Sequence, residues 1–391
     1  MFRFALILGL LSMVGPFAID MYLPALPNIA AEFGATEAAT QITLTAYFLA
    51  FGVAQLVYGP MADAAGRRLP IVIGLVIFGL GSAGAAFADS VAQLALWRAV
   101  QGLGGAAVMV VPRAIVRDRY TGNDATRLMA MVMLVISISP MLAPLAGSTV
   151  MAFGGWREIF GLLCAVACLS LALTLFVLPE TLAPEDREPM KAGAMLRAAR
   201  VLVTDRVFMG MTLVGGFGMA SFFVFISSAS FVYVDQFGLS ATQFSLAFAL
   251  NAIGFFTASQ FAAPLGRRIG ITRVILVGVS GFAALTVLLF ALLAAGFGSL
   301  PLILAGLFLA NSFLGVVMPT TMVVSLDDHG DIAGMAASLG GTLQMLVGGL
   351  TIVVAGTFFD GTATPMVGAI ALCGSLAFVL AQLTPRREVT V

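Results

Sequence analysis

Hydrophobic residues gather in long runs along this 391-residue chain, and short polar segments separate the runs. About 20 consecutive apolar residues are enough to cross the hydrocarbon core of a bilayer as a helix. The pattern therefore predicts an all-α membrane protein with twelve transmembrane helices, six on either side of a polar insert. The predicted spans are 4–23, 40–60, 70–88, 92–116, 124–153, 157–178, 207–232, 241–264, 272–297, 300–324, 332–358 and 364–383.

The polar insert, residues 179–206, holds ten of the 38 charged residues of the chain. It is too short to build a core of its own, so we interpret it as a cytoplasmic linker. This divides the chain into an N-terminal bundle, 1–178, the linker, and a C-terminal bundle, 207–391. Within the linker, residues 191–203 are predicted to form an amphipathic helix on the membrane surface.

Basic residues fix the expected orientation. With twelve spans, sixteen of the nineteen Lys and Arg residues fall on one face of the membrane. The positive-inside rule assigns that face to the cytoplasm, so both termini are expected there. The acidic segment 327–331 should lie on the same face, where we predict that Asp331 caps the eleventh helix. His329, the one histidine, sits among these carboxylates, which leaves a pH-sensing role open.

The composition excludes several other classes of protein. Hydrophobic residues make up 60% of the chain and charged residues 10%, with a mean hydropathy of +1.07, which no soluble domain of this size matches. A net charge of zero argues against nucleic-acid binding. The three cysteines, Cys164, Cys168 and Cys373, have no accompanying histidine or acid, so we expect no metal site. No phosphate-binding G-x-x-x-x-G-K-[ST] signature is present, and we expect no cofactor.

One apolar run carries a charge well inside it. Arg98 begins a stretch of fourteen uncharged residues that ends at Arg113. A charge at membrane depth is costly and normally faces a partner or a water-filled cavity. Gln101 follows on the same side of the predicted helix. Gly102 and Ala106 have the small-xxx-small spacing that allows a neighbouring helix to approach closely.

The two halves also repeat one another. The tripeptide ATQ precedes the second span at residues 39–41 and the eighth at 241–243. Each of these spans ends near a proline and is followed by a Gly-Arg-Arg loop, at 66–68 and at 266–268. This recurrence predicts two pseudo-symmetric six-helix bundles, an organisation found in many secondary transporters.

Residues 59–68, GPMADAAGRR, resemble the loop signature G-x-x-x-D-x-x-G-R-[RK] of the major facilitator superfamily, and residues 98–104, RAVQGLG, resemble its fourth-helix signature. Residues 20–27, DMYLPALP, and 337–340, ASLG, are similar to those of the bicyclomycin/chloramphenicol-resistance subfamily of drug/proton antiporters. The antiporter signature G-P-x-x-G-G reads APLAGS at 143–148, which keeps Pro144 and Gly147. The resemblance covers essentially the whole chain and implies the major facilitator fold.

The resemblance implies that Asp20 carries the coupling proton, because its acidic residue occupies this position. An interfacial charge at a helix end is the alternative. Arg98 would tune the proton site or, alternatively, lock helices together as a structural counter-ion. Arg113 would share in proton coupling or extend to the cytoplasmic surface, and the two interpretations are equal.

The loop signature implies a cytoplasmic gate. Two acids around one arginine can hold loop and helix ends together in one state of the transport cycle. Topogenic charge alone would explain the arginines but not the acid of the loop. The expected gating residues are Gly59, Asp63, Gly66, Arg67, Arg68 and Asp118.

The resemblance implies a transporter that exports hydrophobic or amphipathic drugs across the bacterial inner membrane in exchange for protons, by alternating access. We expect it to act as a monomer on drug-like small molecules. Phenylalanine and methionine surfaces suit varied apolar ligands because they can repack. The candidate substrate-binding residues are Asp20, Tyr47, Gln101, Phe222, Phe223, Phe225, Asn251 and Gln344. The alternative is proton-coupled transport of a polar metabolite, a sugar or an amino acid. An intramembrane enzyme would need a nucleophile–base pair or a metal cluster, and the sequence shows neither.

Overall fold

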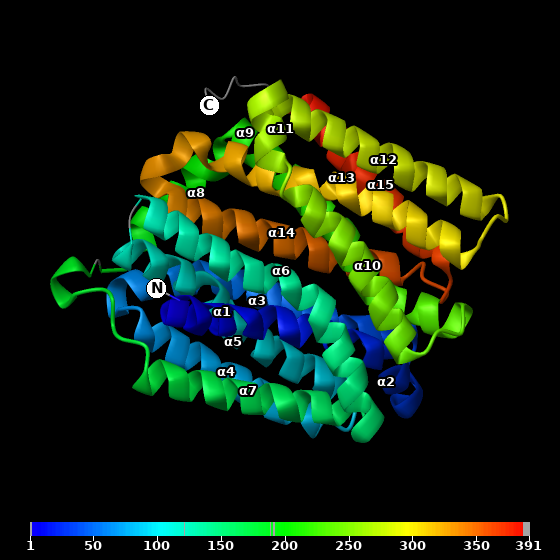
Figure 1. Ribbon diagram of the computed structural model, residues 1–391, viewed down its shortest axis with the longest axis horizontal. Coiled ribbons are helices and arrows are strands. Elements are labelled where there is room, and N and C mark those ends of the chain that lie inside the picture. The colour runs from blue at the N-terminus through cyan, green and yellow to red at the C-terminus, as the bar shows by residue number, and fades with distance from the viewer. Residues whose placement is uncertain (1, 121, 188, 191, 386–391) are drawn as a thin grey trace. The chain divides into compact units, whose positions relative to one another are not determined.

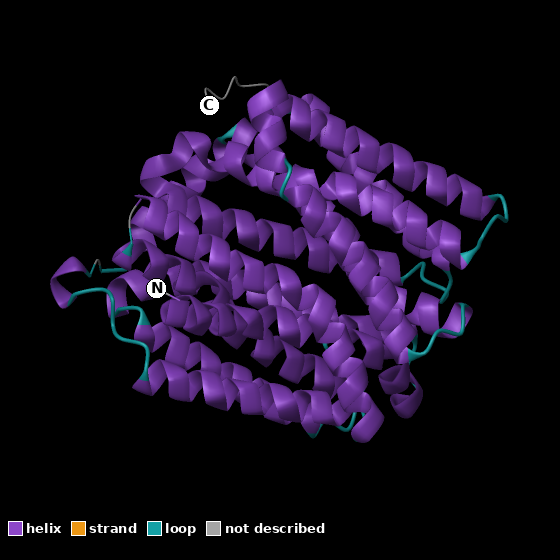
Figure 2. Cartoon of the chain, viewed as in Figure 1, coloured by secondary structure: helices purple, strands orange, loops and turns teal. Residues whose placement is uncertain are grey.

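The computed structural model describes residues 2–120, 122–187, 189–190 and 192–385. Helices make up nearly all of this part of the chain, and Figure 2 shows no strand among the described residues. The all-α prediction is therefore confirmed. Lys191, where the amphipathic linker helix was expected to begin, lies outside the described residues, as does the C-terminal segment 386–391.

The chain divides into two compact units, Met1–Ala192 and Gly193–Val391. Unit 1 contains α1 (Phe2–Asp20), η1 (Leu23–Ala25), α2 (Leu26–Phe33), α3 (Glu37–Ala65), α4 (Arg68–Ala86), α5 (Val91–Arg119), α6 (Gly122–Phe153), α7 (Trp156–Phe176) and η2 (Pro184–Asp186) (Figure 1). Unit 2 contains α9 (Arg206–Phe231), η3 (Val232–Gln236), α10 (Ala241–Ser259), α11 (Ala262–Ile269), α12 (Ile271–Ala294), α13 (Leu300–Leu326), η4 (Asp327–Ile332), α14 (Ala333–Gly356) and α15 (Ala363–Leu383). The helix α8 (Ala192–Thr204) begins at the boundary.

Eleven continuous helical segments of the described chain are long and apolar enough to cross a membrane. The longest, Leu300–Gly356, has 57 residues and includes both α13 and α14, joined by the 3-10 turn η4. At about 1.5 Å per residue, each of these two helices alone exceeds the ~30 Å of a bilayer core. The described chain thus supplies the twelve predicted spans.

Local sequence explains where several spans begin. The Thr36 and Ser90 hydroxyls accept hydrogen bonds from the third residues of α3 and α5, at 3.2 Å each. Asp205 accepts from the Val207 and Phe208 N–H groups at the start of α9. These side chains satisfy N–H groups that would otherwise lack partners at a helix start.

The first span is longer than predicted, and it is broken. α1 ends at Asp20, and the chain continues through η1 and α2 to Phe33 instead of ending at Leu23. Pro24 and Pro27 each lie in the first positions of a new helical segment. A proline there costs little, because its missing N–H would have no helical partner.

The same packing order recurs in the two units. In unit 1, α5 packs against α3 and α4, α4 against α7, and α1 against α6. In unit 2, α13 packs against α10 and α12, α12 against α15, and α9 against α14. Each helix of the second set occupies the same place in its own bundle as its counterpart in the first. This repeated packing agrees with the two pseudo-symmetric six-helix bundles expected from the sequence repeat.

Two local predictions are wrong. Asp331 does not cap the eleventh span: Ile332 occupies the N-cap of α14, and no side chain caps it. The chain stays in a 3-10 turn there, so the Ala333 N–H bonds to the Gly330 carbonyl and needs no carboxylate. The second Gly-Arg-Arg, 266–268, is helical rather than a loop, because a new helix, α11, starts at Ala262.

The linker segment 192–204 is helical as α8. Leu202 is fully buried and packs with Phe208 and Ala336 of unit 2. Leu196 and Val201 are exposed, so α8 presents a second apolar surface on its outer side.

Candidate functional site

Arg98 lies about two turns into α5 and is completely buried in unit 1. Its Nη1 donates to the Ala18 carbonyl of α1 at 2.9 Å and to Gln101 Oε1 at 2.5 Å. Gln101 in turn donates to the Ser82 hydroxyl of α4 at 2.8 Å. One guanidinium thus joins three helices through a short polar chain.

Aromatic rings enclose the rest of the cation. The Arg98 Cζ lies 4.5 Å from the centre of the Tyr47 ring, 4.8 Å from Tyr22 and 5.8 Å from Phe160. A desolvated cation facing a ring gains about 2 kcal/mol. Its Nε and Nη2 have no hydrogen-bond partner among the described residues. The cation is therefore held by rings and a carbonyl, and part of its hydrogen-bonding capacity stays unused.

Asp20 is the last residue of α1, directly before the break, and is only 4% exposed. In the described part of the chain its carboxylate forms no hydrogen bond or ion pair, and Arg98 instead holds the carbonyl two residues earlier. A buried carboxyl group without a fixed partner is costly when ionised. The structure thus places Asp20 and Arg98 at the same end of α1 without an ion pair between them.

Small residues make this closeness possible. A Cβ at Gly102 would lie 2.4 Å from the Tyr47 carbonyl oxygen, so α5 and α3 could not approach as they do. A Cβ at Gly147 would lie 2.0 Å from the Met21 carbonyl oxygen, at the break that follows α1. Ala106 is fully buried along α5. Pro144 lies inside α6, one turn before Gly147.

At the other end of α3 the loop signature forms a second cluster, the Arg67 clasp, which consists of Asp63, Arg67 and Asp118. Arg67 donates from Nε and Nη2 to the two carboxylate oxygens of Asp118, at 2.7 and 3.0 Å. Its Nη1 donates to Asp63 at 2.5 Å. The side chains of Arg67 and Asp118 are 7% and 14% exposed, and that of Asp63 is 58% exposed.

A carboxylate from the linker completes the clasp. Glu180 accepts hydrogen bonds from the N–H groups of Arg67, at 2.8 Å, and Arg68, at 3.2 Å. The next residue, Thr181, donates its hydroxyl to Asp118 at 2.9 Å. Gly66 has a φ of +90°, and a Cβ there would lie 2.6 Å from a Glu180 oxygen. Glycine is thus required at position 66 for both reasons.

The remaining gating candidates lie nearby. Gly59 is partly buried in the last turns of α3. Arg68 donates to the Leu175 carbonyl at 2.6 Å, which ties the start of α4 to the end of α7.

The charges in the clasp favour each other. Burial lowers the pKa of Arg67, but hydrogen bonds to Asp118 and Asp63 outweigh this effect, so its pKa is raised overall. Partial burial raises the pKa of Glu180, and the N–H donors of Arg67, Leu182, Arg68 and Thr181 outweigh it and lower the pKa overall. Hydrogen bonds to a charged form stabilise that form.

Arg113 is not part of either cluster. It lies one turn before Arg117 on α5 and is partly buried, and its Nε has no partner among the described residues.

The predicted residues of unit 2 form an aromatic core. The Phe225 ring stacks on Phe248 of α10 at 5.6 Å, and Phe222 stacks on Phe255 at 6.0 Å. Phe223 contacts Gly348 of α14, where a Cβ would lie 2.3 Å from its ring. These rings link α9 to α10 and α14.

The amides of unit 2 are packed as well. Asn311 donates to Asn251 at 3.4 Å, and Asn251 donates to the Ala247 carbonyl at 3.2 Å. Gln344 lies against α9, with its Nε2 2.8 Å from where a Cβ of Gly215 would be. The structure thus brings Tyr47 and Gln101 together in unit 1, and the three phenylalanines lie in unit 2.

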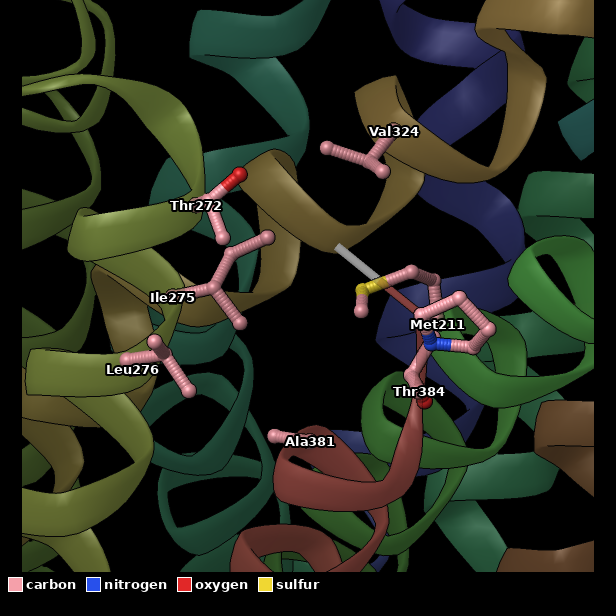
Figure 3. A pocket seen from close by; sticks show the side chains of 8 residues that line it. Met211, Thr272, Ile275, Leu276, Val324, Ala381 and Thr384 are labelled. Carbon is pink, nitrogen blue, oxygen red and sulfur yellow. The ribbon is translucent and has the colours of Figure 1, made fainter. Parts of the chain in front are cut away.

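The histidine and a small cavity lie elsewhere in unit 2. His329 Nε2 is 3.9 Å from Asp205, and its ring meets Phe208 edge-on. A cavity of about 20 Å³ lies between α9, α12, α13 and α15 (Figure 3). Met211, Ile275 and Val324 give it apolar walls, so it suits one water molecule at most and no substrate.

The sequence model of the Major Facilitator Superfamily matches residues 8–352 of this chain. The chain belongs to the major facilitator superfamily. It is 30% identical to the bicyclomycin resistance protein homolog of Haemophilus influenzae over 95% of this chain and 93% of that protein. It is 29% identical to the chloramphenicol resistance protein of Pseudomonas aeruginosa, over 97% of this chain and 89% of that one.

Solved structures show the same fold. A D-xylose-proton symporter matches this transporter with a TM-score of 0.75 and 16% identity, over 98% of this chain and 97% of the other. A mutant of the nucleoside transporter NupG matches with a TM-score of 0.77 and 16% identity, over 97% and 98% of the two chains. Because it belongs to the major facilitator superfamily, the protein is a multi-pass membrane transporter and not an enzyme.

Sequence reasoning missed five residues that surround the buried arginine or complete the clasp of this transporter. They are Tyr22, Ser82, Phe160, Glu180 and Thr181. Glu180 carried a signal, since it is a charge two residues after a predicted span. The other four have ordinary residue types for their segments, and only the fold gives them partners.

Proposed function

We propose that this transporter exports hydrophobic or amphipathic drugs across the bacterial inner membrane in exchange for protons, with both termini in the cytoplasm. The observation that carries the proposal is Asp20, a buried carboxyl group without a fixed partner at a break in the first span. Such a group can gain and lose a proton without first breaking a salt bridge. The names of the two relatives, which concern bicyclomycin and chloramphenicol resistance, support the drug class.

In the proposed cycle, alternating access exposes Asp20 to one side of the membrane at a time, and its protonation favours release of the drug. Arg98 keeps a positive charge near the end of α1 through the Ala18 carbonyl. The Arg67 clasp biases one state of the cycle, for which a small free-energy difference is enough. The transporter acts as a monomer, because each step uses residues of one chain.

The test is drug susceptibility in a host that lacks its own efflux pumps. Expression of the wild type should raise resistance to several apolar drugs, and a proton uncoupler should remove the protection. Asp20→Asn is neutral at every pH and should give no protection although the protein reaches the membrane. Asp89→Asn, an exposed acid between α4 and α5, is the matched control and should protect like the wild type.

Purified protein in proteoliposomes separates the alternatives. Drug accumulation should follow an imposed pH gradient, and Asp20→Asn should still bind drug but not concentrate it. Gradient-driven export by Asp20→Asn would disprove the coupling role. Saturable transport of one sugar or amino acid, with no effect on drugs, would favour a metabolite transporter instead.

A further inference from the structure

A third polar cluster, besides the Arg98 site and the Arg67 clasp, lies at the end of unit 1 away from the clasp. Glu32, near the end of α2, accepts hydrogen bonds from Trp156 Nε1 at 2.6 Å and from Arg157 Nη1 at 2.5 Å. Arg157 also donates to the Ala88 carbonyl at 3.1 Å, just after α4. We name Glu32, Trp156 and Arg157 the Glu32 node. It joins the end of the broken first span to the start of α7.

The indole is the centre of this node. The Arg157 guanidinium lies 4.2 Å from the centre of the Trp156 ring, and Phe33 meets the same ring edge-on at 5.7 Å. Trp156 itself is only 4% exposed, whereas the side chains of Glu32 and Arg157 are 42% and 38% exposed. The node therefore has a solvent-facing ion pair on one side and a buried ring on the other.

A continuous series of rings leads from the node to the buried cation. Trp156 meets Phe160, one turn along α7, edge-on at 6.0 Å. Phe160 lies 5.4 Å from Tyr22, and both rings face Arg98, at 5.8 and 4.8 Å from its Cζ. Phe160, Tyr22 and Arg98 are fully buried. Displacement of one member must move the next, because close-packed interiors transmit strain.

We propose that Glu32 and Trp156 are positioning residues for the Arg98 site. They fix α2 and the start of α7, and through Phe160 and Tyr22 they set the place of the Arg98 guanidinium beside the end of α1. The proposal rests on the proposed function only in taking Arg98 and Asp20 as the coupling site.

The break in the first span gives the reason for such an anchor. A continuous helix would hold Tyr22 in place by its backbone hydrogen bonds. Here α1 ends at Asp20, so the segment that carries Tyr22 is held by the hydrogen bond between the Tyr22 and Thr43 hydroxyls, at 2.8 Å, and by what fixes its far end. That far end is α2, and its last turn carries Glu32. An exposed ion pair alone adds about 0–1 kcal/mol to stability, so a role confined to stability predicts only a small effect.

The first experiment measures turnover. Glu32→Gln should lower kcat for drug transport about fivefold and leave KM unchanged, because the node lies outside the candidate substrate-binding residues. Trp156→Phe keeps the ring contacts but loses the N–H donor, and it should lower kcat less. Glu158→Gln removes a neighbouring exposed acid from the same turn of α7 and serves as the control, with wild-type kcat.

The second experiment uses the two tryptophans of the chain, Trp97 and Trp156. In Trp97→Phe protein, the emission of Trp156 reports the node alone. Because the rings between Arg98 and Trp156 are in contact, a change at the buried site should alter the surroundings of the indole. Arg98→Lys and Phe160→Leu should each shift the Trp156 emission spectrum, and Glu158→Gln should not.

The results separate this proposal from the proposed function. Unchanged kcat in Glu32→Gln, or unchanged emission in both Arg98→Lys and Phe160→Leu, would overturn the positioning role. Equal loss of kcat in Glu32→Gln and Glu158→Gln would also overturn it, because removal of any acid at this end of unit 1 would then lower kcat. Proton-driven export by Asp20→Asn would defeat the coupling role of Asp20 and leave the emission result standing.

Discussion

The tripeptide Gly-Arg-Arg occurs once in each unit, after the second span of each bundle, and its two copies have different structures. At 66–68 it is a bend with Gly66 at a φ of +90°, and Arg67 is buried among Asp63, Asp118 and Glu180. At 266–268 it lies within α11, where both arginines are exposed. A Cβ at Gly266 would meet nothing within 4 Å.

The surrounding residues explain the difference. Position 63 is an aspartate, and the matching position of the second copy, three residues before its glycine, is Ala263. Asp118 and Glu180 approach the first copy from α5 and the linker. Among the described residues, neither Arg267 nor Arg268 forms an ion pair, so no clasp favours a bend in the second copy, and helical hydrogen bonds prevail. The tripeptide marks an equivalent place in the repeat, but its partners decide what it does.

The largest effect that this comparison predicts is at the arginines. Arg67→Gln removes the cation between two carboxylates, one of them nearly buried, and should destabilise unit 1 by about 2–3 kcal/mol. Transport should fall at least about tenfold at equal expression, because loss of the clasp removes the bias between two states of the cycle. Arg267→Gln is the control and should transport like the wild type. Equal losses in the two variants would show that positive charge alone matters.

The two glycines, Gly66 and Gly266, should also respond differently to substitution. Gly66→Ala places a Cβ against Glu180 at a positive φ and should cost about 1–3 kcal/mol. Gly266→Ala adds a Cβ in open space within a helix and should stabilise by about 0.5–1 kcal/mol. Thermal unfolding in detergent measures both. A destabilised Gly266→Ala would mean that the second copy does not stay helical.

Sequence patterns predict most of the fold because spanning runs and basic loops follow from the physics of the bilayer. The predicted end of a span is wrong where the chain bends but stays apolar. Between Asp20 and Phe33, two prolines begin new helical segments instead of ending the span. Arg98 can be predicted because a charge in an apolar run is rare. Its hydrogen bond to the Ala18 carbonyl cannot be predicted, because every residue has a carbonyl group. Only the fold brings the end of α1 within reach of Arg98. Glu180 is 113 residues from Arg67, and no local pattern links them.

A smaller effect is expected at Glu180, and it should depend on pH. Glu180→Gln loses the charge that N–H donors favour and should cost about 1 kcal/mol at neutral pH. The pKa of Glu180 is lowered by these N–H groups, so its stabilisation is complete above the ordinary value of about 4.3 and is lost as the pH falls through the lowered value. The difference in Tm between wild type and Glu180→Gln should thus be constant from about pH 5 to 8 and shrink below about pH 4. A difference that grows on acidification would contradict this assignment.

The smallest effect is expected at Asp63, the most exposed member of the clasp. Its side chain is 58% exposed, and Arg67 keeps both bonds to Asp118 when Asp63 changes. Asp63→Asn retains an acceptor oxygen and loses only a screened charge, worth about 0.5 kcal/mol. Transport should slow about twofold, with folding and substrate binding unchanged. Initial rates in proteoliposomes at low and high salt provide the measurement, since screening should reduce the difference between wild type and variant.

The reverse exchange, Ala263→Asp, should leave transport unchanged, because Arg267 is exposed on α11 and forms no ion pair among the described residues to which a new acid could be added. A gain or loss of transport in Ala263→Asp would mean that one acid beside the tripeptide is enough, and that Asp118 and Glu180 are not what separates the two copies.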